Sequence, residues 1–185
     1  MIETDPDAAL LARVANGDQA AVRLLVAAKL PRVMGLANRL LRDSGEAEDV
    51  AQEAFVRTWR QAPRWETGRA RVDTWLHTVV LNLCRDRLRR QRPVADDAVP
   101  EIADPAPSAP TVLIEAEEGR AVAAAIQDLP ERQRDAILLV HYSDCSGVEA
   151  AAILEVSVQA LESLLARGRR TLRARLRDEE DGSGD

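Results

Sequence analysis

The chain has 185 residues, a formal net charge of −6 at pH 7, and 46% hydrophobic but only 3% aromatic residues. A core with so few aromatic side chains must be built from Leu, Val, Ile and Ala, a composition that favours helices over a β-sandwich. No run of about 18 apolar residues occurs, so no insertion into a membrane is predicted. The acidic start MIETDPDAALLARV lacks the features of a signal peptide, and we expect a cytoplasmic protein.

Charge is distributed unevenly along the chain. Residues 1–92 carry 16 basic and 12 acidic side chains, whereas residues 93–118 carry seven acidic side chains and no basic one. Residues 119–185 carry nine arginines, six of them between Arg167 and Arg177. Because local patches bind DNA and the overall charge only adjusts the background, the net charge of −6 does not exclude nucleic acid as a partner.

The segment PVADDAVPEIADPAPSAPT contains five prolines and no periodic apolar face, which predicts an extended acidic linker over residues 93–111. Helical periodicity on both sides, without alternation of period two, indicates an all-α protein. We therefore expect two small helical domains, residues 5–92 and 112–178. The acidic end, residues 179–185, is predicted to be a disordered tail.

Four helices are predicted in the first domain. Asp5-Pro6 is a typical helix start, and further helices are expected over about 19–41, 47–61 and from Asp73 or Thr74 to Arg90. In the second domain, helices are expected over about 113–126 and, after a box-like start at Asp128, up to Tyr142.

The third predicted helix, AEDVAQEAFVRTWR, has one apolar and one polar face. Val50, Ala54 and Trp59 are expected to face a core, with Phe55 near the edge of that stripe. The polar face is either a solvated charged surface or a docking surface for helices of another protein. Its residues are Asp49, Gln52, Glu53 and Arg57.

The fourth predicted helix, TWLHTVVLNLCRDRLRR, and the loop before it concentrate arginine beside two tryptophans, Trp65 and Trp75. Arginine and aromatic side chains near a loop suit single-stranded nucleic acid, because unstacked bases need platforms and phosphates need cations. Asn82 has a donor and an acceptor for a base edge, although it is equally compatible with a surface amide, and Trp75 with a core residue. The candidate DNA residues are Arg64, Arg69, Arg71, Asn82, Arg85 and Arg89.

The end of the chain, SGVEAAAILEVSVQALESLLARGRRTLRARLR, predicts two helices around a tight turn. Ser146 and Glu149 have the spacing of a capping box, and Ser157 is a good N-cap for the second helix. One stripe of that helix is apolar, formed by Leu161, Leu164, Leu165 and Leu172, and the opposite stripe carries Gln159, Ser163, Arg167 and Arg170. A major groove accepts such a helix, but an ordinary packed hairpin with a solvated basic end fits the same residues.

The chain offers little for catalysis. His77, His141, Cys84 and Cys145 match no zinc spacing, so we expect no metal site, no cofactor and reduced thiols. A glycine-rich phosphate loop and a nucleophile elbow are absent from the sequence, which argues against an enzyme.

These blocks, in this order, resemble the extracytoplasmic-function (ECF) sigma factors of the sigma-70 family over residues 8–177. AEDVAQEAFVRTWR is similar to their core-polymerase-binding helix, and TWLHTVVLNLCRDRLRR to their −10 element helix. LPERQRDAILL and the following helix-turn-helix are similar to their −35-binding domain. Departures from the family pattern are Glu162 and Leu164, where basic residues are frequent, and Glu155, where glycine is usual.

The resemblance implies a transcription initiation factor that recognises the −35 and −10 promoter elements and promotes melting, with an anti-sigma factor as a further partner. It assigns Asp49, Gln52, Glu53 and Arg57 to core polymerase, including the β′ clamp helices and the β subunit. It assigns Arg64, Arg69, Arg71, Asn82, Arg85 and Arg89 to the melted −10 strand. It assigns Ser157, Gln159, Glu162, Ser163, Arg167 and Arg170 to the −35 element. The alternative is a stand-alone helix-turn-helix regulator with a sensor pocket or dimer surface in the first domain.

Overall fold

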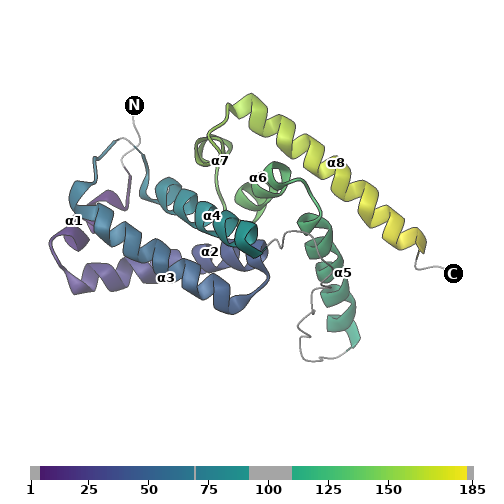
Figure 1. Ribbon diagram of the computed structural model, residues 1–185, viewed down its shortest axis with the longest axis horizontal. Coiled ribbons are helices and arrows are strands. Elements are labelled where there is room, and N and C mark those ends of the chain that lie inside the picture. Colours follow the sequence, from purple (N-terminus) through teal and green to yellow (C-terminus); the bar gives the residue numbers. More distant parts are fainter. Residues whose placement is uncertain (1–4, 69, 92–109, 183–185) are drawn as a thin grey trace.

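The computed structural model describes residues 5–68, 70–91 and 110–182, and within them the regular elements are helices (Figure 1). The elements of the first half are α1 (Ala8–Ala15), α2 (Gln19–Leu41), α3 (Ser44–Gln61), the 3-10 turn η1 (Ala62–Arg64) and α4 (Val72–Gln91). Those of the second half are α5 (Pro110–Gln127), α6 (Glu131–Tyr142), α7 (Gly147–Ile153) and α8 (Val158–Gly182).

Local capping explains where several helices start. The carboxylate of Asp18 accepts hydrogen bonds from the first backbone amides of α2, and that of Asp43 accepts one from Glu46 in α3. Ser146 and Glu149 form the predicted capping box at α7, and the Ser157 hydroxyl accepts from the amide of Ala160 in α8. These bonds satisfy amides that have no partner inside the helix.

The first half packs α3 and α4 against the long helix α2. Leu36 and Leu40 of α2 are buried against Val50 of α3 and Val80 of α4. A smaller core, centred on Leu11, Leu25 and Val72, holds α1 and the start of α4 against the other end of α2. Figure 1 shows α1 at the far end of this group, away from the second half.

The second half is organised around α6, across which α8 runs. Leu138 and Leu139 of α6 are buried, as are Leu161 and Leu165 of α8. Gly168 permits the close crossing, because a Cβ atom at this position would lie 3.2 Å from Cγ1 of Ile137. The helix-turn-helix that the sequence predicted is present as α7 and α8, and both helices pack against α6.

The two halves are packed against each other, an arrangement that the sequence does not predict. Helix α4 contacts α7, α2 contacts α6, and one continuous apolar core extends from α2 to α8. At the edge of this interface the Arg39 guanidinium lies 4.5 Å from the ring centroid of Tyr142, and Gln127 donates to the carbonyl of Arg39. The interface thus combines apolar burial with polar contacts.

Several local predictions were wrong. Helix α1 begins at Ala8 and not at Pro6; the Asp5 carboxylate accepts a hydrogen bond from the amide of Asp7, as an N-cap does, and another from the amide of Val72. Asp128 does not cap α6; its carboxylate pairs with Arg175 of α8. At Asp128 a contact that is distant in sequence therefore engages the side chain that the local motif placed at a helix start.

Helix boundaries and faces also differ in places. Helix α4 starts at Val72, before the predicted caps, and α8 continues to Gly182, into the segment expected to be disordered. Phe55 is buried at 4% exposure, whereas Trp59 remains 37% exposed, the reverse of the predicted order. Of the predicted linker, residues 93–111, residues 93–109 lie outside the described residues, as do residues 183–185, whereas Pro110 and Thr111 already belong to α5.

Candidate nucleic-acid and protein interfaces

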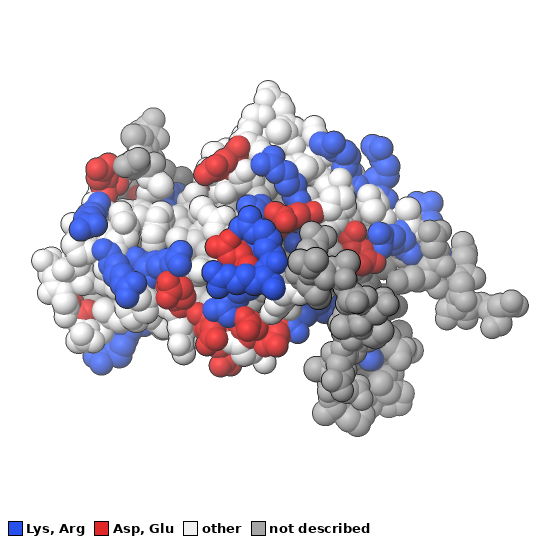
Figure 2. All heavy atoms as spheres, viewed as in Figure 1, with Lys and Arg blue, Asp and Glu red and all other residues white. Residues whose placement is uncertain are grey.

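The outer face of α8 carries the polar residues that the sequence predicted. All six candidates for the −35 element are exposed: Ser157, Gln159, Glu162, Ser163, Arg167 and Arg170. The opposite face is anchored, since Leu161 and Leu165 are at most 7% exposed. The Ser163 hydroxyl donates to the Gln159 carbonyl, and Arg167 Nε donates to the Ser163 carbonyl at 3.1 Å. Figure 2 shows basic side chains gathered along α8.

A second polar surface lies on α3. Asp49, Gln52 and Arg57 are exposed, and Glu53 is half-buried. Arg57 Nε donates to Glu53 Oε1 at 2.8 Å, and this hydrogen bond lowers the pKa of Glu53. Asp49 Oδ2 lies 3.8 Å from Arg87 of α4, so the acidic face of α3 continues into basic side chains of the neighbouring helix.

Beside this polar surface an apolar groove runs between α2 and α3. Leu30 and Trp59 line it and are among the large apolar side chains that stay exposed, at 38% and 37%. The apolar residues along the groove are Val26, Leu30, Met34, Ala51, Phe55, Val56 and Trp59. The sequence analysis missed this groove because it assigned Trp59 to the core.

The loop before α4 and the outer face of α4 form a third surface. Asn82 and Arg64 are exposed, and Arg89 is exposed while pairing with Asp86. Trp65 and Trp75 meet edge to face, with ring centroids 6.1 Å apart, and line a shallow pocket together with Arg64. The indole nitrogen of Trp65 is buried without a hydrogen-bond partner. Arg69, a further candidate, lies outside the described residues.

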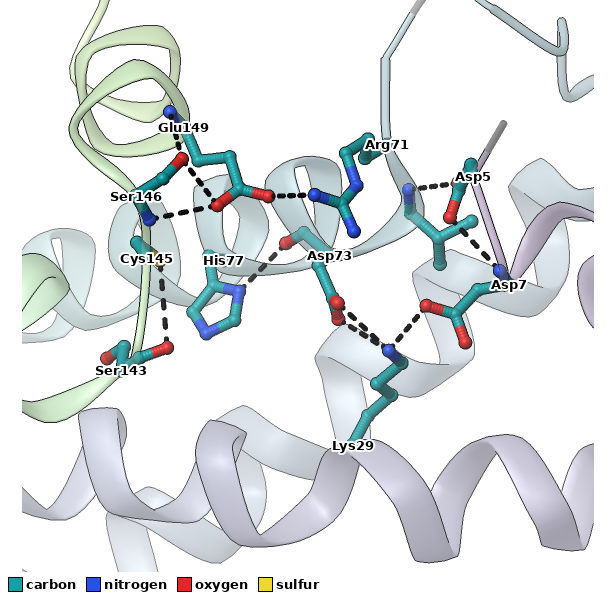
Figure 3. Close-up of polar contacts among 11 residues, drawn as sticks. Asp5, Asp7, Lys29, Arg71, Asp73, His77, Ser143, Cys145, Ser146 and Glu149 are labelled. Atoms are coloured by element: carbon teal, nitrogen blue, oxygen red, sulfur yellow. Dashed lines mark hydrogen bonds and ion pairs between the residues drawn. The ribbon is translucent and has the colours of Figure 1, made fainter. Parts of the chain in front are cut away.

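Two of the predicted DNA-binding arginines pair with acidic side chains of the second half of the protein, although the Arg71 side chain stays 40% exposed. Arg71 Nη1 lies 2.6 Å from Glu149 Oε1 of α7 (Figure 3). Arg85 Nη2 lies 2.6 Å from Asp135 Oδ2 of α6, and its Nε lies 3.3 Å from Glu131. Of the six residues assigned to the −10 strand, Arg71 and Arg85 are therefore ion-paired across the two halves, whereas Arg64 and Asn82 are exposed.

The carboxylate of Asp135 is the most enclosed of these acidic groups. Its side chain is 0% exposed, and its Oδ1 has no hydrogen-bond partner. Burial raises the pKa of Asp135, and the positive charge of Arg85 offsets only part of that effect. For Glu149, burial also raises the pKa, but the hydrogen bonds from Ser146 and the charge of Arg71 outweigh it and leave the pKa lowered.

A buried ionic cluster supports the start of α4 (Figure 3). Lys29 Nζ pairs with Asp7 and, at 2.8 Å, with Asp73, and its side chain is only 10% exposed. Burial lowers the pKa of Lys29, but the two carboxylates outweigh it and leave the pKa raised. The sequence analysis did not single out Lys29, although Leu25, Lys29 and Val33 share one buried stripe of α2 at a spacing of four residues.

His77 lies close to the contact between the two halves. Its Nδ1 is 2.8 Å from the Asp73 carbonyl, and its Nε2 is buried without a partner. Burial lowers the pKa of His77. His77, Ser143 and Cys145 line one small polar cavity, but among the described residues no three potential ligands come together as a metal site.

Two family models match this chain. Sigma-70 region 2 matches residues 25–94, and Sigma-70 region 4 matches residues 119–172. The chain is 30% identical to the ECF RNA polymerase sigma factor SigW of Bacillus subtilis, over 90% of this chain and 94% of SigW. It is 33% identical to SigK of Mycobacterium bovis, over 93% of this chain and 94% of SigK. It is also 34% identical to RfaY of Xanthomonas campestris, a probable sigma factor of which it spans 43%.

Solved structures show the same fold. The structure of CnrH in complex with the cytosolic domain of CnrY superposes on 93% of this chain with a TM-score of 0.73, at 28% identity. The sigma factor RpoE of Bartonella quintana, solved with the anti-sigma factor NepR, superposes on 84% with a TM-score of 0.65, at 24% identity. The described helices include none long and apolar enough to cross a bilayer.

The fold and the two matched regions define a member of the sigma-70 family of transcription initiation factors. Within that family the chain is an RNA polymerase sigma factor of the extracytoplasmic-function type, because it aligns over nearly the full length of SigW and SigK. The stand-alone regulator weighed from the sequence is therefore not favoured.

Proposed function

We propose that four surfaces carry the separate binding functions of a sigma factor. They are the outer face of α8, the polar face of α3, the apolar groove between α2 and α3, and the outer face of α4 with the loop before it. The chain acts by binding, without catalysis of its own, and works inside the cell where polymerase and promoter are found. We also propose that residues 5–92 serve as the polymerase and −10 domain, residues 112–178 as the −35 domain, and residues 93–111 as the linker.

Core polymerase docks on α3 and on the apolar groove beside it. The acidic and polar side chains Asp49, Gln52, Glu53 and Arg57 contact the β′ clamp helices. The groove supplies the apolar area that stable association of helices requires, and its exposed residue Trp59 is of a type enriched at binding hot spots. Such interfaces usually combine an apolar core with polar contacts around it.

The melted −10 strand lies across the loop and the outer face of α4. Asn82 reads a base edge, and Arg64, Arg69 and Arg89 bind phosphates. The pocket beside Trp65 and Trp75 is suited to an unstacked base, since aromatic side chains and a cation contribute stacking and charge together. Arg71 and Arg85, which pair here with Glu149 and Asp135, are assigned to the same strand.

Helix α8 enters the major groove of the −35 element. The observation that carries this assignment is that all six predicted contact residues are exposed along one face while the opposite leucines are buried. Gln159 and the two arginines Arg167 and Arg170 offer donors to base edges and phosphates, and Glu162 can accept from a cytosine amino group.

An anti-sigma factor is the proposed regulator of this chain. The support comes from two structural relatives, CnrH and RpoE, which were solved in complexes with the cytosolic domain of CnrY and with the anti-sigma factor NepR. The apolar groove between α2 and α3 is the surface that such a partner would need to cover in order to exclude polymerase.

The decisive experiment is run-off transcription with purified bacterial core polymerase and a pool of promoter fragments. The wild-type protein is expected to direct transcripts from defined start sites. Asp49→Ala/Gln52→Ala is expected to abolish both the transcripts and binding to core. The control Asp128→Ala, which removes one acidic charge in the second half, is expected to retain both. Retained core binding in the double variant would contradict the assignment of α3, and failure of wild type to bind core would contradict the proposed function itself.

A further inference from the structure

The first turn of α8 differs in character from the rest of that helix. Val158 opens α8 and is 41% exposed, and among the described residues of α8 it is the only large apolar side chain that stays exposed. The leucines that follow it at the spacing of the apolar stripe, Leu161 and Leu165, are at most 7% exposed. An apolar stripe that is buried elsewhere therefore reaches solvent at the start of α8.

Charge is also divided along α8. The residues from 158 to 166 include no arginine and a single charged side chain, Glu162, whereas arginines occupy positions 167, 169, 170, 173, 175 and 177. Helices that read DNA in the major groove place their N-terminal residues against base edges, and cationic side chains bind phosphates. The start of α8 is therefore suited to bases, and its later turns supply the charge that phosphates require.

We propose that Val158 is a specificity-determining residue of the −35 interface and contacts the C5-methyl group of a thymine. This inference rests on the proposed entry of α8 into the major groove. The thymine methyl is the apolar group that the base pairs present there, and the other edge groups are hydrogen-bond donors and acceptors. The valine side chain has neither a donor nor an acceptor, so its contact favours thymine over the other bases.

Local structure fixes the position of Val158. The Ser157 hydroxyl accepts a hydrogen bond from the amide of Ala160 at 3.1 Å, which caps the first turn. Leu161 is 1% exposed and ties this turn to the core. Valine is also stiff at its first side-chain torsion, so little freedom is lost when its methyl groups meet a base. In Figure 1 the start of α8 lies at the outer edge of the molecule, next to α7.

Glu162 follows Val158 by four residues and is exposed. Side chains at this spacing on a helix lie about 5–6 Å apart, which is within about two base-pair steps of DNA. In the proposed interface Glu162 accepts a hydrogen bond from a cytosine amino group. Together the two side chains favour a −35 element in which a thymine lies close to a cytosine.

The test uses the protein bound to core polymerase. Promoter fragments with a randomised −35 region are selected by binding to this complex and sequenced, which identifies the preferred element. Each thymine of that element is then replaced by deoxyuridine, which removes only the C5-methyl group. Affinity for the substituted duplexes is measured by anisotropy at fixed salt for wild type, Val158→Ala and a control, Val148→Ala. The control makes the same substitution at a valine of α7 that is 70% exposed.

If the proposal holds, deoxyuridine at one position weakens binding of the wild type about threefold to fivefold, which corresponds to the burial of one methyl group. The same replacement has no effect in Val158→Ala and its full effect in Val148→Ala. Three results would each overturn the proposal: a selected element without thymine, no effect of deoxyuridine in the wild type, and an equal loss in wild type and Val158→Ala.

A further variant distinguishes failure of this inference from failure of the proposed interface. Arg167→Ala is expected to weaken binding to the selected element, whichever group Val158 contacts. If neither Arg167→Ala nor Val158→Ala changes binding to the −35 region, the assignment of α8 is wrong. If Arg167→Ala weakens binding but the deoxyuridine effect does not depend on Val158, only the role of Val158 is refuted.

Discussion

Helices α4 and α8 are both rich in arginine, but the fold exposes their arginines to different degrees. Both carry arginines at spacings that predict a DNA-binding face. On α8 that face is exposed along its length, and the leucines behind it are buried against α6. On α4, Arg85 pairs with Asp135 of the other half of the chain, and Arg71, which directly precedes α4, pairs with Glu149.

The comparison shows what decides whether a basic helix face is available. Helix α8 lies at the surface of the molecule (Figure 1) and buries its apolar stripe, while Arg169 and Arg175 make polar contacts with His141 and Asp128. Helix α4 is packed on several sides, by α2 and α3 of its own half and by α7 of the other. Figure 2 shows acidic side chains interleaved with the basic ones around the end of α4, whereas those along α8 are mainly basic.

The largest effect on stability is expected for the buried ionic cluster of Lys29, Asp7 and Asp73 at the start of α4. Lys29→Met should leave the carboxylates of Asp7 and Asp73 buried without a cation and should lower the free energy of unfolding by about 3 kcal/mol. Chemical denaturation followed by circular dichroism measures this change. Arg23→Met, on an exposed position of the same helix, should change stability by less than about 0.5 kcal/mol. Equal losses in the two variants would show that the cluster is not stabilising.

The next effect tests the free face of α8. Arg167→Ala should weaken binding of the polymerase complex to a −35 promoter by about 1–3 kcal/mol, because its guanidinium faces the groove in the proposed complex. Arg169→Ala removes the same charge from the side of α8 that lies next to His141 and should weaken binding less. A filter-binding or anisotropy titration at fixed salt separates the two. An equal loss in both would mean that α8 contributes only general electrostatics.

A smaller effect concerns pH and the α4 contact with the second half. Burial holds the pKa of His77 below its ordinary value of 6.5, so the unfolded chain takes up a proton before the folded one does. Stability should therefore be constant above pH ~7 and fall as the pH drops through 6.5, with a slope of at most about 1.4 kcal/mol per pH unit from this group. His77→Asn should flatten this dependence in melting curves from pH 8 to 5.5.

Charged groups around His77 modulate that result. Asp73 raises its pKa, and Arg32 and Lys29 lower it. Asp135 acts in the opposite direction at lower pH, because a buried carboxyl with a raised pKa is protonated more readily in the folded state. A pH dependence that persists unchanged in His77→Asn would assign the effect to these other groups.

The smallest effect concerns the rates at which the thiols of Cys84 and Cys145 react. Burial raises the pKa of Cys84 and of Cys145 to about 12, so few thiolates form at neutral pH. Both thiols should react with a disulfide reagent at pH 8 far more slowly than free cysteine, and the rate should rise to that of free cysteine in denaturant. Fast reaction of the folded protein would show that the contact around Cys145 opens readily.

Much of the architecture was predictable because its causes are local. The span of α2, the capping box of Ser146 and Glu149, and the two faces of α8 all follow from residues three or four positions apart. Local motifs failed where a distant partner was better placed. Asp128 was predicted to cap α6 and instead pairs with Arg175, and Phe55 instead of Trp59 fills the core.

The sequence by itself determined the family, the helices and the outward face of α8, since periodicity, capping and motif order are written in neighbouring residues. Only the tertiary structure decided that Arg71 and Arg85 are occupied, that Lys29 joins two carboxylates, and that Trp59 lies in an open groove. These outcomes depend on which helices meet across the chain. Burial and pairing between residues far apart in sequence leave no local pattern to read.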